Sequence, residues 1–307
     1  MNPASLLPNG LVFLERGWLS SNNILIMDGQ QSCLIDTGYW SHADQTLALV
    51  ENALGKRSLT QILNTHLHSD HCGGNAALQA RFPLAVTAVP PGQAAHVFEW
   101  DPVALTYAPT GQHCPQFRAD GVIRPGAVFE VGQMQWEVHG APGHDPHSVI
   151  FHCPEHGILI SADSLWENGF GVVFPELEGI SAFDEVAATL EVIERLQPRI
   201  VLPGHGAAFT DVNGALDRAR RRLSDFRLDP RKHGRHAAKV LLKFKLLELQ
   251  RVNRVEFLEW AATTHYLQMI HQTYGHGRLI EDWLADLVEQ LQKAGAAHMQ
   301  GQDLVNL

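Results

Sequence analysis

The chain has 307 residues, of which 45% are hydrophobic and 18% charged, so it is long enough for two domains and too apolar to be disordered. It contains no run of 18 apolar residues and no basic stretch followed by an apolar core near its start, so we expect neither a membrane span nor a secretory signal. The net charge of −10, taken as a whole, argues against a nucleic-acid partner, and four cysteines without CxxC spacing indicate free thiols in a cytoplasmic protein. Histidine is unusually frequent, with 18 residues, so the histidine positions need an explanation.

Residues 1–210 predict short strands separated by turns, with a few helices between them. Apolar runs bounded by turn residues predict strands over 11–15, 23–27, 32–36, 61–64, 86–89, 128–131, 135–139, 149–152, 157–161 and 200–202. Apolar residues at helical spacing predict helices over 42–54, 75–81 and 182–196. The turn dipeptide Asp28-Gly29 also predicts a hairpin, which favours a mixed α/β sandwich over a doubly wound parallel sheet.

The composition changes beyond residue 213. Helical spacing there predicts helices over 215–226, 231–250, 254–272 and 279–294, with a loop over 273–277 and almost no strand character. Asn213-Gly214 is a turn dipeptide at this change. We therefore expect two domains, 1–212 and 213–307, of which the second is smaller and mainly helical.

The charge changes at the same place. Residues 1–210 carry 8 Lys and Arg against 21 Asp and Glu (net −13), whereas residues 211–307 carry 15 against 12 (net +3). The stretch 218–254 alone holds 13 basic and 3 acidic residues, a net charge of +10. Three interpretations stay open for this stretch: a solvated helix face docked on the acidic first half, a site for a phosphorylated carrier such as coenzyme A, or a nucleic-acid-binding face.

A cluster of potential metal ligands directly follows the predicted strand 61–64. His66 and His68 stand two residues apart and can point the same way from an extended chain, and Asp70 and His71 follow on the loop. Imidazole and carboxylate groups are ligands for zinc, iron or manganese. The segment therefore predicts a metal site.

The sequence His66-Leu67-His68-Ser69-Asp70-His71 after a short strand resembles the signature of the metallo-β-lactamase-fold hydrolases. Four further motifs of that family occur in the expected order. They are Asp36-Thr37-Gly38, Pro142-Gly143-His144, Asp163 after the apolar run 158–160, and Pro203-Gly204-His205-Gly206. The resemblance covers residues 1 to about 210. It implies a four-layer αββα sandwich followed by a helical, winged-helix-like appendage.

The resemblance also implies a role for each matching residue. A first metal ion would be held by His66, His68 and His144. A second would be held by Asp70, His71 and His205, with Asp163 bridging both ions, zinc being the first choice and iron or manganese the alternatives. Asp36 would orient a ligand imidazole through a hydrogen bond. A hydroxide bridging the ions would attack the substrate while Asp70 takes its proton.

Three functions follow as expectations. The first is a dinuclear-metal hydrolase of a thioester or ester bond in a small molecule. The second is a metal-dependent endoribonuclease whose basic C-terminal domain grips RNA, and the third is a metal-binding protein that is catalytically idle. Asp163 stands where the zinc β-lactamases of the family use cysteine, which argues against antibiotic hydrolysis.

Several residues near these motifs are candidates for the substrate pocket. Tyr39, Trp40, His147, Trp166 and Phe170 follow or flank the ligand motifs, as does Phe174 further along, and apolar side chains there would suit an acyl chain. Ordinary packing explains each of them about equally well or better. The scattered histidines, such as His139 and His152, are expected to be structural or solvated.

Overall fold

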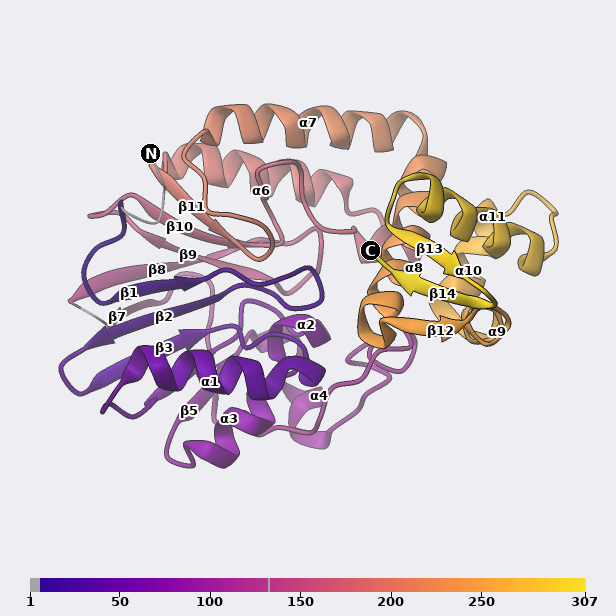
Figure 1. The fold of residues 1–307 in the computed structure, drawn as a ribbon. Helices are drawn as coiled ribbons and strands as arrows, with labels where there is room; N and C mark the ends of the chain where they lie inside the picture. The colour runs from indigo at the N-terminus through magenta and orange to yellow at the C-terminus, as the bar shows by residue number, and fades with distance from the viewer. Residues whose placement is uncertain (1–5, 132) are drawn as a thin grey trace.

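The computed structural model describes residues 6–131 and 133–307 and contains two large β-sheets packed face to face (Figure 1). The first sheet has the strand order β1-β2-β3-β4-β5-β6. Its strands are β1 (Leu11–Leu14), β2 (Asn23–Asp28), β3 (Gln31–Ile35), β4 (Gln61–Leu63), β5 (Val86–Val89) and β6 (Gly121–Val122). Strands β1, β2 and β3 pair antiparallel, with β2 and β3 joined by the predicted hairpin, and β3 to β6 pair parallel.

The second sheet has the order β11-β10-β9-β8-β7. Its strands are β7 (Val128–Val131), β8 (Met134–Gly140), β9 (Val149–Cys153), β10 (Ile158–Ala162) and β11 (Ile200–Pro203). All pairs are antiparallel except β10 with β11. The apolar faces of the two sheets meet in one core that includes Ile24, Ile35, Trp136 and Phe151, so each strand hides its alternate side chains from water.

Helices cover the outer faces of both sheets. In residues 36–99 these are α1 (Ala43–Leu54), α2 (Ser69–Cys72), α3 (Asn75–Arg81) and α4 (Ala94–Glu99), with the 3₁₀ turns Trp40–His42 and Pro91–Gln93. After β10 follow α5 (Phe174–Leu177), α6 (Phe183–Leu196) and α7 (Val212–Leu228). Helices α1 and α3 share a core with the first sheet, and α6 and α7 share one with the second. The predicted four-layer αββα sandwich is confirmed.

The C-terminal part has its own apolar core, and its helical character is confirmed. It contains α8 (Pro230–Leu249), α9 (Arg254–Thr263), α10 (His265–Tyr274) and α11 (Ile280–Lys293). The prediction of a single helix over 254–272 is wrong, because two helices occupy this segment. The chain leaves the helix at Thr264, which has extended backbone angles (φ −73°, ψ 122°) and whose hydroxyl donates to the Trp260 carbonyl.

A small antiparallel sheet in this part was not predicted. Strand β14 (Asp303–Asn306) lies between β12 (Arg251–Asn253) and β13 (Ala297–Gln300). These strands are short and mostly polar, and β12 finds its partner about fifty residues away in the chain, so neither alternation nor a local turn predicts them. Among the described helices none is long and apolar enough to cross a membrane.

The division at residues 212 and 213 stays a prediction. Helix α7, which begins at Val212, buries Leu216, Leu223 and Phe226 in the core shared with α6. The C-terminal core instead takes Ala237 and later apolar residues of α8, together with Val172 and Leu177 from the segment after β10. Helix α7 therefore packs with the sandwich and contributes no described residue to the C-terminal core.

Candidate metal centre

The site lies where four chain segments meet at one end of the two sheets. Strand β4 ends at Leu63, and the following loop and the one-turn helix α2 carry four of the predicted ligands. Gly73 lets this helix approach the 3₁₀ turn that begins at Trp40, because a Cβ at position 73 would lie 2.5 Å from the Trp40 backbone nitrogen. The loops after β8, β10 and β11 bring the other three predicted ligands to the same place.

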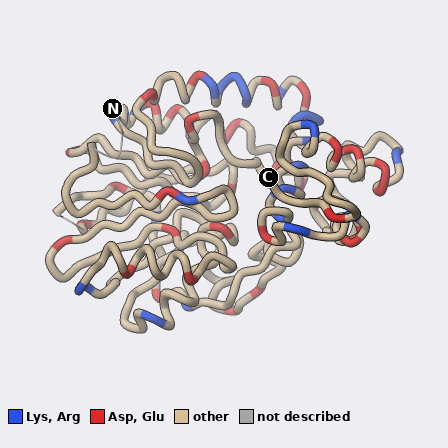
Figure 2. Tube along the Cα trace, viewed as in Figure 1, with Lys and Arg blue, Asp and Glu red and all other residues tan. Residues whose placement is uncertain are grey.

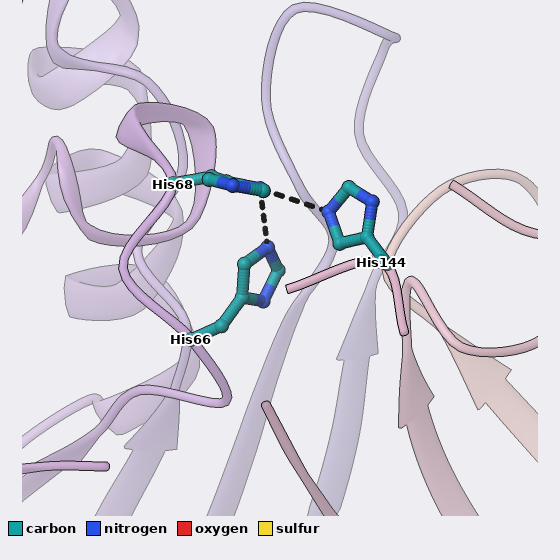
Figure 3. A group of neighbouring side chains, drawn as sticks. All are labelled: His66, His68 and His144. Atoms are coloured by element: carbon teal, nitrogen blue, oxygen red, sulfur yellow. Dashed lines mark hydrogen bonds between the residues drawn. The ribbon is translucent and has the colours of Figure 1, made fainter. Parts of the chain in front are cut away.

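Three histidines form the first group of ligand atoms (Figure 3). His68 Nδ1 lies 3.1 Å from His66 Nε2 and 2.8 Å from His144 Nε2. His66 and His144 are buried, and His68 is nearly so. Three imidazole nitrogens from two distant segments therefore converge on one point.

Asp70, His71 and His205 form the second group. His205 Nε2 lies 3.1 Å from Asp70 Oδ2, and His71 Nε2 lies 3.9 Å from the same oxygen. Asp163 stands between the groups, with Oδ1 3.4 Å from His71 Nε2 and Oδ2 3.5 Å from His144 Nε2. The structure thus brings together all seven predicted ligand residues, with the aspartate in the middle.

Burial and mutual charge set the protonation of these groups. Burial lowers the pKa of His68 to about 3 and that of His66 well below its usual value. Burial alone would raise the pKa of Asp163, but the neighbouring His205 and His71 outweigh it and hold the pKa well below the usual range. The Asp163 carboxylate is therefore ionised and the His66 and His68 imidazoles are neutral, which are the forms that bind metal ions.

Hydrogen bonds from outside the cluster fix the orientation of the ligands. Asp36 Oδ2 lies 2.7 Å from His71 Nδ1, and the same carboxylate accepts from the backbone and hydroxyl of Thr65. His144 Nδ1 donates to the Val172 carbonyl at 2.6 Å, and Trp166 Nε1 donates to Asp163 at 3.2 Å. Each bond leaves the opposite ring nitrogen or carboxylate oxygen turned into the site.

The donor set fits divalent metal ions. His71 Nε2 is buried without a hydrogen-bond partner among the described residues, and it faces two carboxylates. An unpartnered buried nitrogen is costly, and a metal ion would satisfy it. The His and Asp groups are therefore suited to binding divalent metals.

A cavity of about 570 Å³ opens above these side chains. His68, Asp70, His144, Asp163 and His205 form one part of its wall. The remaining wall is largely apolar and comes from distant segments, mainly α8. These residues include Trp18, Trp166, Phe174, Val240, Leu241, Phe244, Leu247 and Leu291.

The predicted pocket residues divide into two sets. Trp166 lines the cavity, and so does Phe174. Tyr39, Trp40, His147 and Phe170 are absent from the described lining. Tyr39 is fully buried with its ring against Phe244, and Phe170 is buried in the core between the second sheet, α6 and α7.

Sequence reasoning missed two features of the cavity. Trp18 stacks on the His205 ring, with ring centres 5.3 Å apart and planes at 4°, although no motif surrounds it. The α8 face was also missed, because a helix that lines a cavity shows the same apolar spacing as one that packs in a core.

The sequence profile of the metallo-beta-lactamase superfamily matches residues 16–205. A hydroxyacylglutathione hydrolase from Stenotrophomonas maltophilia is 34% identical over 151 residues, which are 49% of this chain and 48% of that protein. An atrochrysone carboxyl ACP thioesterase from Aspergillus aculeatus is 27% identical over 201 residues, 63% of this chain and 53% of that protein. The chain spans about half the length of these curated relatives.

Solved structures share the fold. A metallo-beta-lactamase family protein from Thermus thermophilus has a TM-score of 0.57 at 20% identity, covering 98% of this chain and 100% of that one. The BLEG-1 B3 metallo-beta-lactamase has a TM-score of 0.56 at 21% identity, covering 67% of this chain and 96% of its own. At these identities the likeness concerns the fold alone.

Proposed function

The chain belongs to the metallo-beta-lactamase superfamily, and from this premise we propose that it is a metal-dependent hydrolase of a thioester or ester bond in a small molecule. One observation carries the proposal: seven His and Asp side chains converge, and five of them line a largely apolar cavity. The relatives named as a hydroxyacylglutathione hydrolase and an ACP thioesterase support thioester chemistry.

We propose two divalent ions, with zinc as the first choice and iron or manganese as alternatives. The first would be held by His66, His68 and His144 and the second by Asp70, His71 and His205, with Asp163 between them. Such ions supply hydrolytic chemistry by lowering the pKa of water to near 7 and polarising a carbonyl oxygen.

The protein's own groups then position the reaction. Asp70 is 14% exposed at the cavity wall, and His71 and His205 lower the pKa of its carboxyl despite its burial, so it is ionised. Asp70 Oδ2 can take the proton of the attacking water and return it to the departing thiol or alcohol as the bond from carbonyl carbon to sulfur or oxygen breaks. Trp18 and Trp166 lie against His205 and limit the access of bulk water on that side.

The cavity wall suits an acyl group. Val240, Phe244 and Leu247 stand on α8 at helical spacing, and Leu291 on α11 adds to the same wall. An acyl chain placed against these side chains would leave water as it binds. We therefore place the acyl part of the substrate against α8.

Two of the three cationic side chains that line this cavity, Arg222 and Lys239, support an anionic carrier for that acyl group. Arg222 lies over the Phe170 ring, donates to the Asn168 carbonyl and contacts His236 Nε2 at 2.9 Å. Within the described part of the chain, neither Arg222 nor Lys239 forms an ion pair with a carboxylate. Phosphate or carboxylate groups of a thiol carrier, such as coenzyme A, would provide the missing negative charge.

The remaining basic residues give less support to RNA binding. Figure 2 shows Lys and Arg gathered along α7, with acidic residues close by. Seven of the 13 basic side chains in 218–254 form ion pairs: Arg218, Arg220, Arg227, Arg231, Lys232, Lys245 and Arg251. A face already neutralised by carboxylates has little free charge for a phosphate backbone.

We retain the expected domains 1–212 and 213–307 and the expected cytoplasmic location as parts of the proposal. That location rests on the four cysteines, Cys33, Cys72, Cys114 and Cys153, which have no CxxC spacing and are buried.

The decisive experiment compares substrates on protein that has been stripped by a chelator and then reloaded with zinc or manganese. The panel contains an acyl-coenzyme A, the same acyl group on neutral N-acetylcysteamine, a lactone, a phosphodiester and a short single-stranded RNA. We expect the reloaded protein to hydrolyse thioesters and the stripped protein to be inactive. Thioester hydrolysis by the stripped protein, or RNA cleavage with steep salt dependence and no thioester hydrolysis, would contradict the proposal.

A further inference from the structure

A second group of ligand-type side chains lies on the outward face of the second sheet. Trp136, Val138 and Phe151 point into the core between the sheets. Because side chains alternate along a strand, Glu137 and His139 on β8 point the other way, as does His152 on β9. Glu137 and His152 are direct neighbours across the two strands.

These three side chains are close enough to share one ion. Glu137 Oε2 lies 3.2 Å from His139 Nε2 and 3.6 Å from His152 Nδ1, and all three ligand atoms lie within 4.8 Å of one another. Ligands at 2.0–2.2 Å from a tetrahedral ion are separated by roughly 3.3 Å. The spacing around Glu137 therefore already approaches that of a metal site.

His152 gives an independent reason to expect a ligand. Its residue is only 5% exposed, and neither ring nitrogen has a hydrogen-bond partner among the described residues. Its neighbour on the other side is Leu159, which belongs to an apolar core and offers no polar side-chain group. An imidazole withdrawn from water in this way lacks a partner for its Nδ1, the atom that faces Glu137.

We propose that Glu137, His139 and His152 form a third metal site, separate from the candidate catalytic centre. Two imidazoles and one carboxylate select a transition metal ion such as Zn²⁺, Ni²⁺ or Cu²⁺ over Mg²⁺ or Ca²⁺. Glu137 and His139 are partly exposed, at 40% and 29% of their side-chain surface, so the ion enters from solvent and keeps water in its remaining position. The ion joins β8 to β9 and gives His152 Nδ1 a partner.

Equilibrium dialysis against increasing free ZnCl₂, followed by elemental analysis of the protein, tests this site. The proteins are the wild type, His139→Gln and Glu137→Gln, with His156→Gln as the control that removes a nearby histidine outside the group. Loss of an outer partner of a ligand already weakens metal binding 10–100-fold, so loss of a ligand is expected to weaken it by at least roughly tenfold. At zinc concentrations that fill the wild-type site but not the weakened one, the wild type and His156→Gln should therefore bind one zinc ion more than His139→Gln and Glu137→Gln.

His139 and Glu137 are partly exposed, so their variants are expected to fold, and circular dichroism checks this. A second series with MgCl₂ in the dialysis buffer at a hundredfold excess over zinc should leave the additional zinc in place. The proposal is wrong if wild type and His139→Gln bind equal numbers of zinc ions at every concentration, or if magnesium displaces the additional ion. Because the readout is metal content, its outcome is independent of whether the protein hydrolyses a thioester.

Discussion

Asp36 Oδ2 lies 2.7 Å from His71 Nδ1 and holds the ring so that Nε2 faces Asp163 and Asp70. Asp36 has a positive φ of 57°, a conformation in which asparagine and aspartate are tolerated better than most residues. The same carboxylate accepts two further hydrogen bonds from Thr65 and so ties β3 to the ligand loop.

The variant Asp36→Asn keeps the shape and the backbone preference but removes the charge that orients His71. We expect metal affinity to fall roughly 10–100-fold. Competition with a chromogenic chelator measures this, with the surface variant Asp44→Asn as the control. Equal zinc affinity in Asp36→Asn and wild type would show that the hydrogen bond has no role in holding the ligand.

The variant Asp70→Asn tests the proposed proton acceptor. Loss of a general base typically costs about 10²–10⁴ in rate, so we expect kcat for a thioester to fall by that amount. Metal content measured beside the rate separates lost chemistry from lost binding. If Asp70→Asn retains its metal and the wild-type kcat, then Asp70 does not move the proton.

Because Gly171 has no side chain, it leaves space for the ring of the candidate ligand His144. A Cβ at this position would lie 2.3 Å from His144 Nδ1, the atom that donates to the Val172 carbonyl. We expect Gly171→Ala to displace His144 and to weaken metal binding by roughly 10–100-fold. Gly121→Ala is the matched control, because a Cβ there meets nothing within 4 Å. Unchanged metal content in Gly171→Ala would mean that His144 can move without loss.

His233 on α8 accepts a hydrogen bond from the Val173 backbone N–H at 3.1 Å, one residue beyond the carbonyl that holds His144. Burial, and then the charge of Arg222, lower the pKa of His233 to about 4. The unfolded chain, with an ordinary pKa near 6.5, therefore binds more protons between pH 4 and 6.5. Stability from this residue is complete above pH 6.5 and is lost as the pH falls toward 4, by roughly 2 kcal/mol at pH 5.

Urea unfolding at pH 7 and pH 5 tests this. In His233→Gln the loss of unfolding free energy between the two pH values should be smaller than in the wild type by roughly 2 kcal/mol. The exposed His265 on α10 provides the control variant His265→Gln. An equal loss in His233→Gln and wild type would contradict the expected role of His233.

Arg222→Gln tests the anionic carrier. A hydrogen bond to a charged group contributes about 1.5–3 kcal/mol, so kcat/KM for an acyl-coenzyme A should fall roughly 10–100-fold. The N-acetylcysteamine thioester of the same acyl group carries no anion and should be hydrolysed as before. Arg220→Gln is the control, since Arg220 pairs with Glu194 away from the cavity. Equal losses on both thioesters would count against an anion contact.

The seven residues that the structure brings together could be singled out in the sequence because each stands in a short motif that resembles the metallo-β-lactamase fold. His66 and His68 stand next to a strand end, and Pro-Gly-His turns mark His144 and His205. The composition change likewise predicted a helical C-terminal part, although the break at Thr264 and the pairing of β12 with β14 depend on contacts that no short window contains.

The sequence could not show which side chains line the cavity and which are buried in a core. Phe170 and Trp166 stand four residues apart in the same loop, yet one lies in a core and the other at the cavity. Arg222 is one of several arginines along α7, but its guanidinium alone among them packs against Gly169. A Cβ at that glycine would lie 2.5 Å from the Arg222 guanidinium. Such differences come from packing across the chain.

The apolar wall of the cavity and the candidate metal ligands come from different parts of the chain. The ligands are held by backbone turns and by glycines with no room for a side chain, such as Gly171 and Gly204. The opposite wall is one face of α8, where residues such as Val240 and Phe244 can be replaced without touching a ligand. Under the proposed function, substitutions at these positions of α8 would change which acyl groups are accepted and leave the candidate ligands in place, which makes this face of α8 the natural region to diversify when seeking new specificities.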